Sequence, residues 1–324
     1  MLMSVLLFAV GLVLLIKGGD WFVDGATGIA KRFNLPDIVV GATVVSIGTT
    51  LPEVMVSTTG ALQGSGAMAY GNAIGSIICN TALIAAISIV CNPGPVNTKS
   101  MKTPAIFFFA SAALYCLASY VLGTFPRWMG FVMLTIFVCY TILTVRNGLK
   151  NPDAAEEEEE EEGKQRTLVM ELVLLVIGAA VIAVGADLLV EHGQIIAIGL
   201  GVPETVVALL FVALGTSLPE LVTTITSLRS GHASLGVGNV IGANVFNLVL
   251  VSGVAVSLAP FDVPCENTLL NTGLNMSLVF EIPVMLGVMS LMIFPTLASK
   301  KLARWQGILL LGIYIAFCVC QFVL

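Results

Sequence analysis

The chain has 324 residues, of which 57% are hydrophobic and 10% are charged, whereas an ordinary soluble domain carries about 25% charged residues. Such a composition excludes a water-soluble enzyme or binding domain, because too little polar surface remains to cover a fold of this size. The formal net charge of -6 comes largely from one glutamate run at 156–162, and no basic patch suggests binding to nucleic acid. We therefore expect an integral protein of the lipid bilayer.

Ten apolar stretches are each long enough to cross a bilayer as a helix. They cover residues 2–25, 38–62, 67–90, 104–122, 127–146, 168–190, 205–228, 234–258, 281–299 and 304–323. An even number of spans places both termini on one side of the membrane. Arg127 is the only one of the 14 Lys and Arg residues expected in the loops of that side. The positive-inside rule therefore predicts a plasma-membrane protein with both termini outside.

The two halves of the chain are repeats of each other. At a constant offset of 167 residues, SIGTTLPEVMVS from Ser46 aligns with ALGTSLPELVTT from Ala213, and GNAIGSIICN from Gly71 aligns with GNVIGANVFN from Gly238. Each repeat holds five predicted spans, and because five is odd, the second repeat enters the membrane from the opposite side. We predict an all-α membrane protein of ten transmembrane helices in two inverted five-helix repeats, an architecture typical of secondary transporters.

One long polar segment separates the repeats. The chain is predicted to divide into a first repeat at 1–146, an acidic cytoplasmic linker at 147–167 and a second repeat at 168–324. The glutamate run in the linker is compatible with a calcium-sensing patch. A block of like charges repels itself and offers no fixed ligand geometry, so a solvated linker is the preferred interpretation.

Glu53 and Glu220 occupy matching places near the middle of their spans. Each lies about 15 residues into its span, which is roughly 22 Å along a helix. A carboxylate at this depth costs about 2.5–3.5 kcal/mol, and we expect no basic side chain near the middle of any span. A transported cation or a bound proton is therefore expected to neutralise these glutamates.

The residues before each glutamate offer further oxygen ligands. Thr49 and Thr216 precede the glutamates by four positions and so share a helical face with them. Pro52 and Pro219 lack an N–H group and clash with the carbonyl four positions earlier, so both helices should break or kink. Irregular backbone at membrane depth is tolerated where it faces a polar cavity. The carbonyls expected there belong to Ser46–Thr49 and Ala213–Thr216.

The second motif places amide side chains at the same depth. Ser76 and Asn80 are four residues apart on the third span, and in the other repeat Asn247 matches Asn80 while Ala243 replaces Ser76. With the glutamates and threonines they form a set of hard oxygen donors, which suits Ca²⁺ or Na⁺ rather than Zn²⁺ or Cu⁺. Two glutamates neutralise one Ca²⁺, and alternate occupation of one charged site by different cations is the physical basis of antiport.

At these motifs the sequence resembles the calcium/cation antiporter superfamily, and most closely its bacterial sodium/calcium exchanger branch. The paired G-T-[ST]-L-P-E and G-N-x-x-G-[SA]-x-x-x-N blocks carry the resemblance. It implies that Glu53 and Glu220 bind Ca²⁺ with the help of Thr49 and Thr216. The residues that it implies for the Na⁺ sites are Thr50, Ser217, Ser76 and Asn80.

Two positions depart from the family pattern. Asn247 stands where some members carry an aspartate that accompanies K⁺-dependent exchange, which argues against K⁺ cotransport. Ala243 lacks a hydroxyl ligand, so the resemblance supports Ca²⁺ binding more firmly than Na⁺ coupling. We expect exchange of Ca²⁺ for Na⁺ across the plasma membrane by alternating access, with Ca²⁺/H⁺ antiport on the same fold as the alternative.

Other classes of function fit the sequence less well. A cation channel lined by the same oxygens is disfavoured, because a site between inverted repeats is opened by rocking rather than by a continuous pore. A membrane protease needs a Ser–His or HExxH arrangement, and both His192 and His232 are predicted in loops, at the solvated surface. We therefore expect no enzymatic activity and no cofactor besides the transported ions. The sequence does not specify an oligomeric state.

Overall fold

The computed structural model describes residues 2–150, 167–200, 215–264 and 275–323. Nearly all of the first half is helical, with short π-helical turns (η) inside several helices. The elements of the first half are α1 (Leu2–Arg32), α2 (Asp37–Val40), η1 (Gly41–Val45), α3 (Ser46–Thr49), α4 (Leu51–Leu62), α5 (Gly66–Cys79), η2 (Asn80–Ala85), α6 (Ala86–Cys91), β1 (Gly94–Pro95), α7 (Thr98–Cys116), η3 (Leu117–Leu122), β2 (Thr124–Phe125) and α8 (Arg127–Lys150).

The second half follows the same plan. Its elements are α9 (Leu168–Gly199), α11 (Leu218–Arg229), α12 (Ala233–Phe246), η5 (Asn247–Val251), α13 (Ser252–Leu258), β3 (Phe261–Asp262), η7 (Ser277–Glu281), α14 (Ile282–Ser299), β4 (Lys301–Leu302) and α15 (Arg304–Val323). Within the described ranges, 8 helices are long and apolar enough to cross a membrane, and the bent pair of Asp37–Thr49 and Leu51–Leu62 makes 9. The predicted span at 205–228 is described only from residue 215 onward, as α11.

The two repeats fold into matching hairpins. The bounds of α4 and α5, shifted by 167 residues, are the bounds of α11 and α12. The turn between each pair contains a glycine with a φ of 84°, Gly64 in the first repeat and Gly231 in the second. Glycine adopts this left-handed conformation at little cost, so both hairpins turn at the same place.

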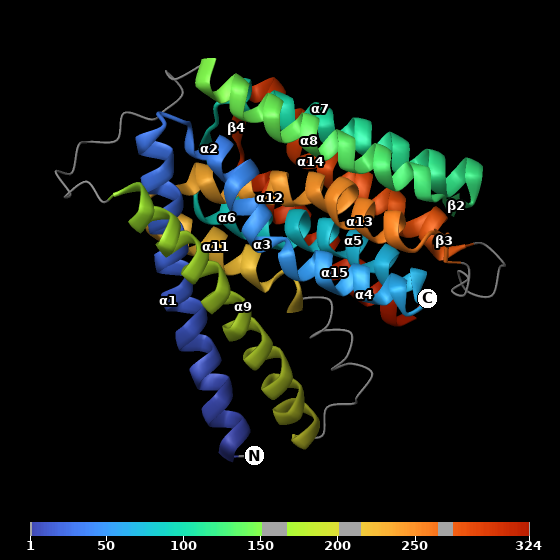
Figure 1. Ribbon diagram of the computed structural model, residues 1–324, viewed down its shortest axis with the longest axis horizontal. Coiled ribbons are helices and arrows are strands. Elements are labelled where there is room, and N and C mark those ends of the chain that lie inside the picture. Colours follow the sequence, from blue (N-terminus) through green and yellow to red (C-terminus); the bar gives the residue numbers. More distant parts are fainter. Residues whose placement is uncertain (1, 151–166, 201–214, 265–274, 324) are drawn as a thin grey trace.

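Two small antiparallel sheets show that the repeats are inverted. β1 pairs with β4, and β2 pairs with β3. Adding 167 to the residue numbers of β1 gives β3, and adding 177 to those of β2 gives β4. The registers also correspond: the pair Gly94 and Leu302 in one sheet matches the pair Phe261 and Phe125 in the other. Figure 1 shows β4 and the β2–β3 region at opposite ends of the bundle. The repeats are therefore interlocked at both ends in the same way.

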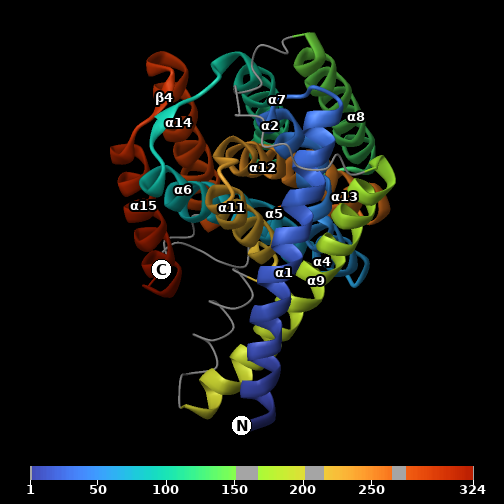
Figure 2. The ribbon, with the colours of Figure 1, turned by 90° about the vertical axis from the view of Figure 1, so that its left-hand side faces the viewer.

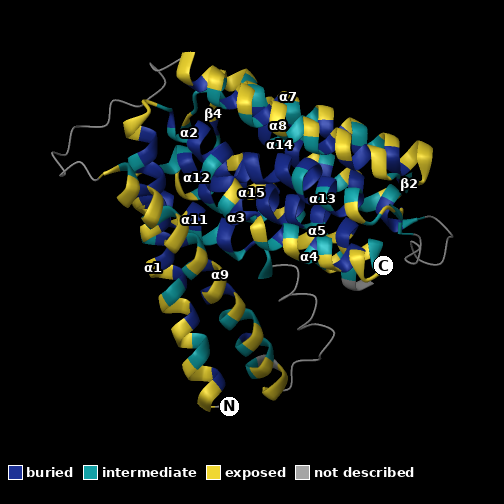
Figure 3. Ribbon diagram, viewed as in Figure 1, coloured by how far each residue is buried: buried dark blue, intermediate teal, exposed yellow. Residues whose placement is uncertain are grey.

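The centre of the bundle is formed by the third and eighth spans. The eighth span consists of α12, η5 and α13, and 83% of the residues in its most apolar 18-residue stretch are buried. The corresponding share for α15 is 17%. Figure 3 shows this contrast between the buried centre and the exposed outer helices, whose apolar surfaces are available to lipid. The chain is thus a multi-pass integral membrane protein, and its core is built around the two G-N-x-x-G helices.

α1 and α9 form a closely packed pair that extends away from the other helices (Figures 1 and 2). The contact is symmetric: a Cβ on Gly18 would lie 2.9 Å from the backbone N of Ile182, and a Cβ on Gly185 would lie 2.9 Å from the backbone N of Leu15. Small residues allow helix backbones to approach closely in membranes. Substitution of either glycine would therefore force the two helices apart.

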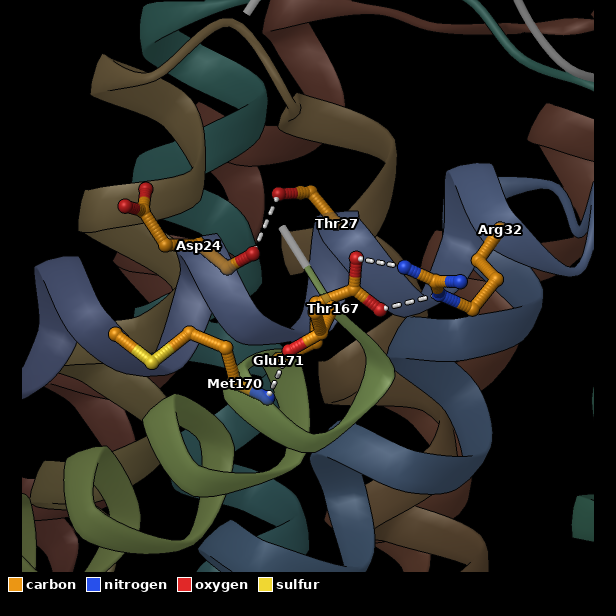
Figure 4. Close-up of polar contacts among 6 residues, drawn as sticks. All are labelled: Asp24, Thr27, Arg32, Thr167, Met170 and Glu171. Atoms are coloured by element: carbon orange, nitrogen blue, oxygen red, sulfur yellow. Dashed lines mark hydrogen bonds and ion pairs between the residues drawn. The ribbon is translucent and has the colours of Figure 1, made fainter. Parts of the chain in front are cut away.

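An ion pair joins the end of α1 to the start of α9. The guanidinium of Arg32 donates to both carboxylate oxygens of Glu171, at 2.9 and 3.2 Å, as Figure 4 shows. Next to it, the Thr167 hydroxyl accepts the backbone N–H of Met170 at 3.3 Å and caps the first turn of α9. A bidentate pair of this kind fixes the relative orientation of its partners.

Three predicted placements were wrong. His192 lies within α9 rather than in a loop, because that helix continues to Gly199. His232 does lie in the α11–α12 turn, but it is not a solvated surface residue, since its Nδ1 lies 2.6 Å from the Asp37 carboxylate and its side chain is only 14% exposed. α1 has a basic side chain at its middle, where none was expected: Lys17, whose Nζ lies 3.9 Å from an Asp20 carboxylate oxygen.

Candidate ion-binding site

The second span is broken where its proline predicted it, and α11 of the seventh span also begins directly before its proline, Pro219. The helix axes on the two sides of Thr50 differ by 45°. Thr50 has φ -84° and ψ -1°, and its counterpart Ser217 has φ -88° and ψ 5°, so these two residues have the same backbone conformation. Pro52 cannot donate to the carbonyl of Gly48, which therefore loses its helical hydrogen bond. Each break opens a new helix N-terminus inside the membrane.

Glu53 and Glu220 lie in the first turns of these new helices, α4 and α11. Both side chains are fully buried at 0% exposure, and they come from opposite repeats. None of the ion pairs among the described residues includes either glutamate. A helix N-terminus favours negative charge by about 0.3–1 kcal/mol, which is far too little to offset two buried carboxylates.

Several oxygens around the glutamates have no protein partner. Of the four carboxylate oxygens, Glu220 Oε1 accepts a hydrogen bond in the described part of the chain, from the Thr50 hydroxyl at 3.5 Å. The buried oxygens left without a hydrogen bond there include Glu53 Oε1 and Oε2, Glu220 Oε2, Ser217 Oγ, Asn80 Oδ1 and Asn247 Oδ1. Each unpaired buried polar group costs about 1–3 kcal/mol. A cluster of unpaired acceptors is the arrangement expected for a site that holds cations.

Two asparagines tie the repeats together across the site. The Thr49 hydroxyl donates to Asn239 Oδ1 at 3.1 Å, and the Thr216 hydroxyl donates to Asn72 Oδ1 at 3.3 Å. These contacts are related by the 167-residue offset, so each repeat reaches into the other in the same way. Asn72 Nδ2 also donates to the Glu53 carbonyl at 3.2 Å. Both asparagines therefore position the segments that carry the glutamates.

Asn80 and Asn247 are each the first residue of a π-helical segment, η2 and η5. η2 packs against α11, and η5 packs against α4, so each asparagine lies on a segment that contacts the other repeat's glutamate helix. Asn247 Nδ2 donates to the Ala243 carbonyl at 3.1 Å, which leaves Oδ1 available. Single π-helical turns in long helices often mark functional sites.

The remaining predicted residues are distributed as follows. Ser46 and Ser76 are buried on α3 and α5, at 0% and 3% exposure. The Ser46 hydroxyl lies 2.8 Å from the Gly41 carbonyl and 2.9 Å from the Asn239 carbonyl. Ala213 lies outside the described residues. The described side chains of the predicted set thus come from α3, α4, α11, the residues directly before α4 and α11, and the central spans of both repeats.

The chemistry of the site is that of hard oxygen ligands. Nowhere in the described ranges do three or more His, Cys, Asp and Glu side chains cluster. The Thr50 hydroxyl contacts the Glu220 carboxylate, and the Asn72 amide contacts the Glu53 carbonyl. Two carboxylates with neutral oxygens match the ligands of Ca²⁺, which takes 6–8 oxygens. The same groups serve Na⁺, and they lack the nitrogen and sulfur ligands that Zn²⁺ prefers.

Asn72 and Asn239 were not among the site residues predicted from the sequence. The signal was present, because they are the second residues of the two G-N-x-x-G blocks and lie eight residues before Asn80 and Asn247. Two helical turns separate such positions, which places all four residues on related faces of the central helices. A polar residue that recurs at the matching position of both repeats, on an otherwise apolar helix, would therefore have identified both asparagines from the sequence.

Comparisons with known proteins agree with this geometry. The profile of the family described as sodium/calcium exchanger protein matches residues 3–146 and 170–323. The chain is 30% identical to the sodium/calcium exchanger MaX1 of Methanosarcina acetivorans, with 98% of both chains covered. It is 34% identical to an uncharacterised membrane protein of Methanocaldococcus jannaschii over 95% of this chain and 94% of that protein.

A solved structure has the same fold. The sodium-calcium exchanger NCX_Mj, soaked with Na⁺ and Sr²⁺, superposes with a TM-score of 0.79 at 33% sequence identity, with 97% of both chains covered. Together with the symmetric hairpins and sheets, this match confirms the predicted fold class of ten transmembrane helices in two inverted repeats.

Proposed function

This chain belongs to the sodium/calcium exchanger family, and from that premise we propose that it is a secondary antiporter that exchanges Ca²⁺ for Na⁺ across the plasma membrane. The observation that carries the proposal is the pair of fully buried glutamates, one from each inverted repeat, whose oxygens are mostly unpaired. Two negative charges without a basic partner require cations, and one Ca²⁺ neutralises both.

For Ca²⁺ we assign ligands that occur as matching pairs, one residue from each repeat. Glu53 and Glu220 supply the charge, and Thr49 and Thr216 supply neutral oxygens from the breaks in the second and seventh spans. The proposal is supported by the 3.5 Å contact of Thr50 with Glu220, which links the first repeat's break to the second repeat's carboxylate. A ligand set shared between repeats is released when the repeats rock relative to each other.

For Na⁺ we assign the neutral oxygens around the same carboxylates. They belong to Thr50, Ser217, Ser76, Asn80 and Asn247, with the backbone around Ser46 and Ala213. Because Na⁺ uses the glutamates as well, Ca²⁺ and Na⁺ exclude each other from the site. Mutual exclusion couples the entry of Na⁺ to the exit of Ca²⁺, and an antiporter of this kind contributes to calcium homeostasis.

We also infer the energetics, the orientation in the membrane and the ion dependence of this exchange. The ions are cargo, so no cofactor is required and no chemical reaction is catalysed. Both termini lie outside and the segment 147–167 lies in the cytoplasm, since the basic residues of the loops gather on the linker side. Asn247 supplies no third charge, and exchange is independent of K⁺. The names of the relatives favour Na⁺ over H⁺ as the coupling ion.

The test is transport by the purified chain in proteoliposomes. Vesicles loaded with Na⁺ should take up radioactive Ca²⁺ when diluted into Na⁺-free medium, and uptake should vanish when Na⁺ is equal on both sides. A proton gradient of the same size should not replace the Na⁺ gradient, and external K⁺ should not alter the rate. Uptake that follows only the proton gradient would replace this proposal with Ca²⁺/H⁺ antiport.

A further inference from the structure

At two positions of the site, one repeat carries a hydroxyl side chain and the other does not. At the offset of 167 residues, Ser76 corresponds to Ala243, and Ser46 corresponds to Ala213. The first repeat thus carries both serines and the second carries both alanines. Compared repeat by repeat, the second repeat lacks two hydroxyl groups.

Each half of the site, however, is formed by one span from each repeat. The serines and alanines must therefore be counted for each half-site rather than for each repeat. The Thr49–Asn239 contact joins the second span to the eighth, and the Thr216–Asn72 contact joins the seventh span to the third. Position 46 therefore belongs to the same half-site as position 243. The half-site that contains Ser46 therefore holds one serine and one alanine, Ala243, and Ser76 belongs to the other half-site.

The contacts of Ser46 place its hydroxyl against α12 at Asn239 and Gly242. Ser46 Oγ lies 2.9 Å from the Asn239 carbonyl and 3.3 Å from Asn239 Oδ1. A side chain on Gly242 would collide with the same Oγ atom. Ser46 therefore lies directly on the turn of α12 that runs from Asn239 to Ala243.

That position is equivalent to the one that a serine at 243 would take. A serine inside a helix commonly donates to the carbonyl four residues earlier, and for position 243 that carbonyl belongs to Asn239. The Ser46 hydroxyl reaches this acceptor from the other repeat at 2.9 Å, and the Gly41 carbonyl, at 2.8 Å, is its second possible acceptor. A hydroxyl that donates its one proton to a carbonyl retains both lone pairs for a cation.

We propose that the Ser46 side chain supplies the cation ligand that is missing at Ala243, so that both half-sites keep one serine hydroxyl. Ser46 Oγ, Thr49 Oγ1 and Asn239 Oδ1 form one cluster of hard oxygens, with distances of 3.3 and 3.1 Å to the amide oxygen. The ligand is a monovalent cation, since the two glutamates already neutralise a Ca²⁺ and these oxygens add no charge. The inference rests on the proposed exchange and assigns one of its Na⁺ ligands.

The experiment compares Ser46→Ala, the double variant Ser46→Ala/Ala243→Ser and wild type in proteoliposomes. Ser88→Ala is the matched control, because Ser88 is also a buried serine, at 3% exposure, whose counterpart in the other repeat is an alanine, Ala255. Two fluxes are measured: Ca²⁺/Ca²⁺ self-exchange without Na⁺, and Ca²⁺ release as a function of external Na⁺.

Ser46→Ala should keep self-exchange within about twofold of wild type and raise the Na⁺ concentration for half-maximal release at least about threefold. The double variant should return that concentration to the wild-type value, and Ser88→Ala should leave both fluxes unchanged. Ser46→Cys, which keeps the side-chain size but replaces the hard oxygen, should behave like Ser46→Ala and serves if the alanine variant does not fold.

Two results would overturn the inference. One is unchanged Na⁺ dependence in Ser46→Ala and Ser46→Cys; the other is a shift that Ala243→Ser does not reverse. Failure of the proposed function is a separate outcome, since wild type would then show no Na⁺-dependent Ca²⁺ release at all.

Discussion

Conversion of either buried glutamate to glutamine should abolish Ca²⁺ binding while the fold persists. Glu53→Gln and Glu220→Gln keep the size of a side chain that is fully buried and remove one of the two charges facing the cation. Removal of one partner from a buried ion pair costs about 3–5 kcal/mol, which corresponds to a loss of roughly 100-fold to several thousand-fold in Ca²⁺ affinity. The ion-free protein should not be destabilised, because the two carboxylates repel each other.

Ca²⁺-dependent thermal unfolding in detergent measures this loss apart from transport. At a Ca²⁺ concentration 100 times the wild-type Kd, binding stabilises the wild type by about 2.7 kcal/mol. A variant whose Kd is 100-fold weaker gains only about 0.4 kcal/mol from the same Ca²⁺ concentration, so its unfolding temperature should hardly move. Glu281→Gln is the control, since Glu281 accepts from Gln321 Nε2 at 3.3 Å and lies on the ninth span.

The reasoning would be refuted by a folded Glu53→Gln or Glu220→Gln variant that Ca²⁺ stabilises as much as the wild type. It would also be refuted if Glu281→Gln lost the Ca²⁺ effect equally, because the glutamates between the repeats would then have no special role. Flux in proteoliposomes should follow the binding data in all three variants.

Three further predictions follow from the geometry of the site. Asn72→Ala and Asn239→Ala should each lower Na⁺-driven Ca²⁺ flux about tenfold through the loss of about 1.5 kcal/mol of hydrogen bonding across the repeats, and normal flux in both would remove the asparagines from the site. Gly238→Ala should lower the free energy of unfolding by about 1–3 kcal/mol in thermal unfolding, because the added methyl group would collide with the Ile38 backbone. Gly71→Ala, at the matching position of the first repeat, should be tolerated, because a Cβ there would have no atom within 4 Å. Equal effects of the two substitutions would contradict the packing. Replacement of residues 151–165 by a Gly/Ser linker of equal length should leave exchange intact, and loss of flux at normal expression would indicate a regulatory role for the acidic run.

Much of the fold was predictable because the membrane restricts the choices. A long apolar stretch must be a helix there, and an odd number of spans per repeat forces inversion. Pro52 predicted the break of the second span because proline removes a hydrogen bond that nothing else in the sequence replaces. Glu53 and Glu220 were identifiable because an unpaired carboxylate at mid-membrane has few structural roles.

Other features required the packing itself. The π-helical turns at Asn80 and Asn247 depend on how the central helices fit around the breaks, and no local residue pattern distinguishes them from α-helix. Prediction of His192 in a loop failed because α9 extends beyond the apolar stretch, supported along its length by its contact with α1. The partnership of Ser46 with α12 is a long-range contact between repeats, which the sequence offset alone does not reveal.

The most direct measurement is to locate the cation. Crystals of the protein soaked with Sr²⁺ as a substitute for Ca²⁺ at low Na⁺ should show an anomalous peak between the carboxylates of Glu53 and Glu220. High Na⁺ should remove that peak, because the two ions share the site. A peak elsewhere in the protein, or one between the glutamates that Na⁺ does not displace, would contradict exchange of Ca²⁺ for Na⁺ at a single site between the repeats.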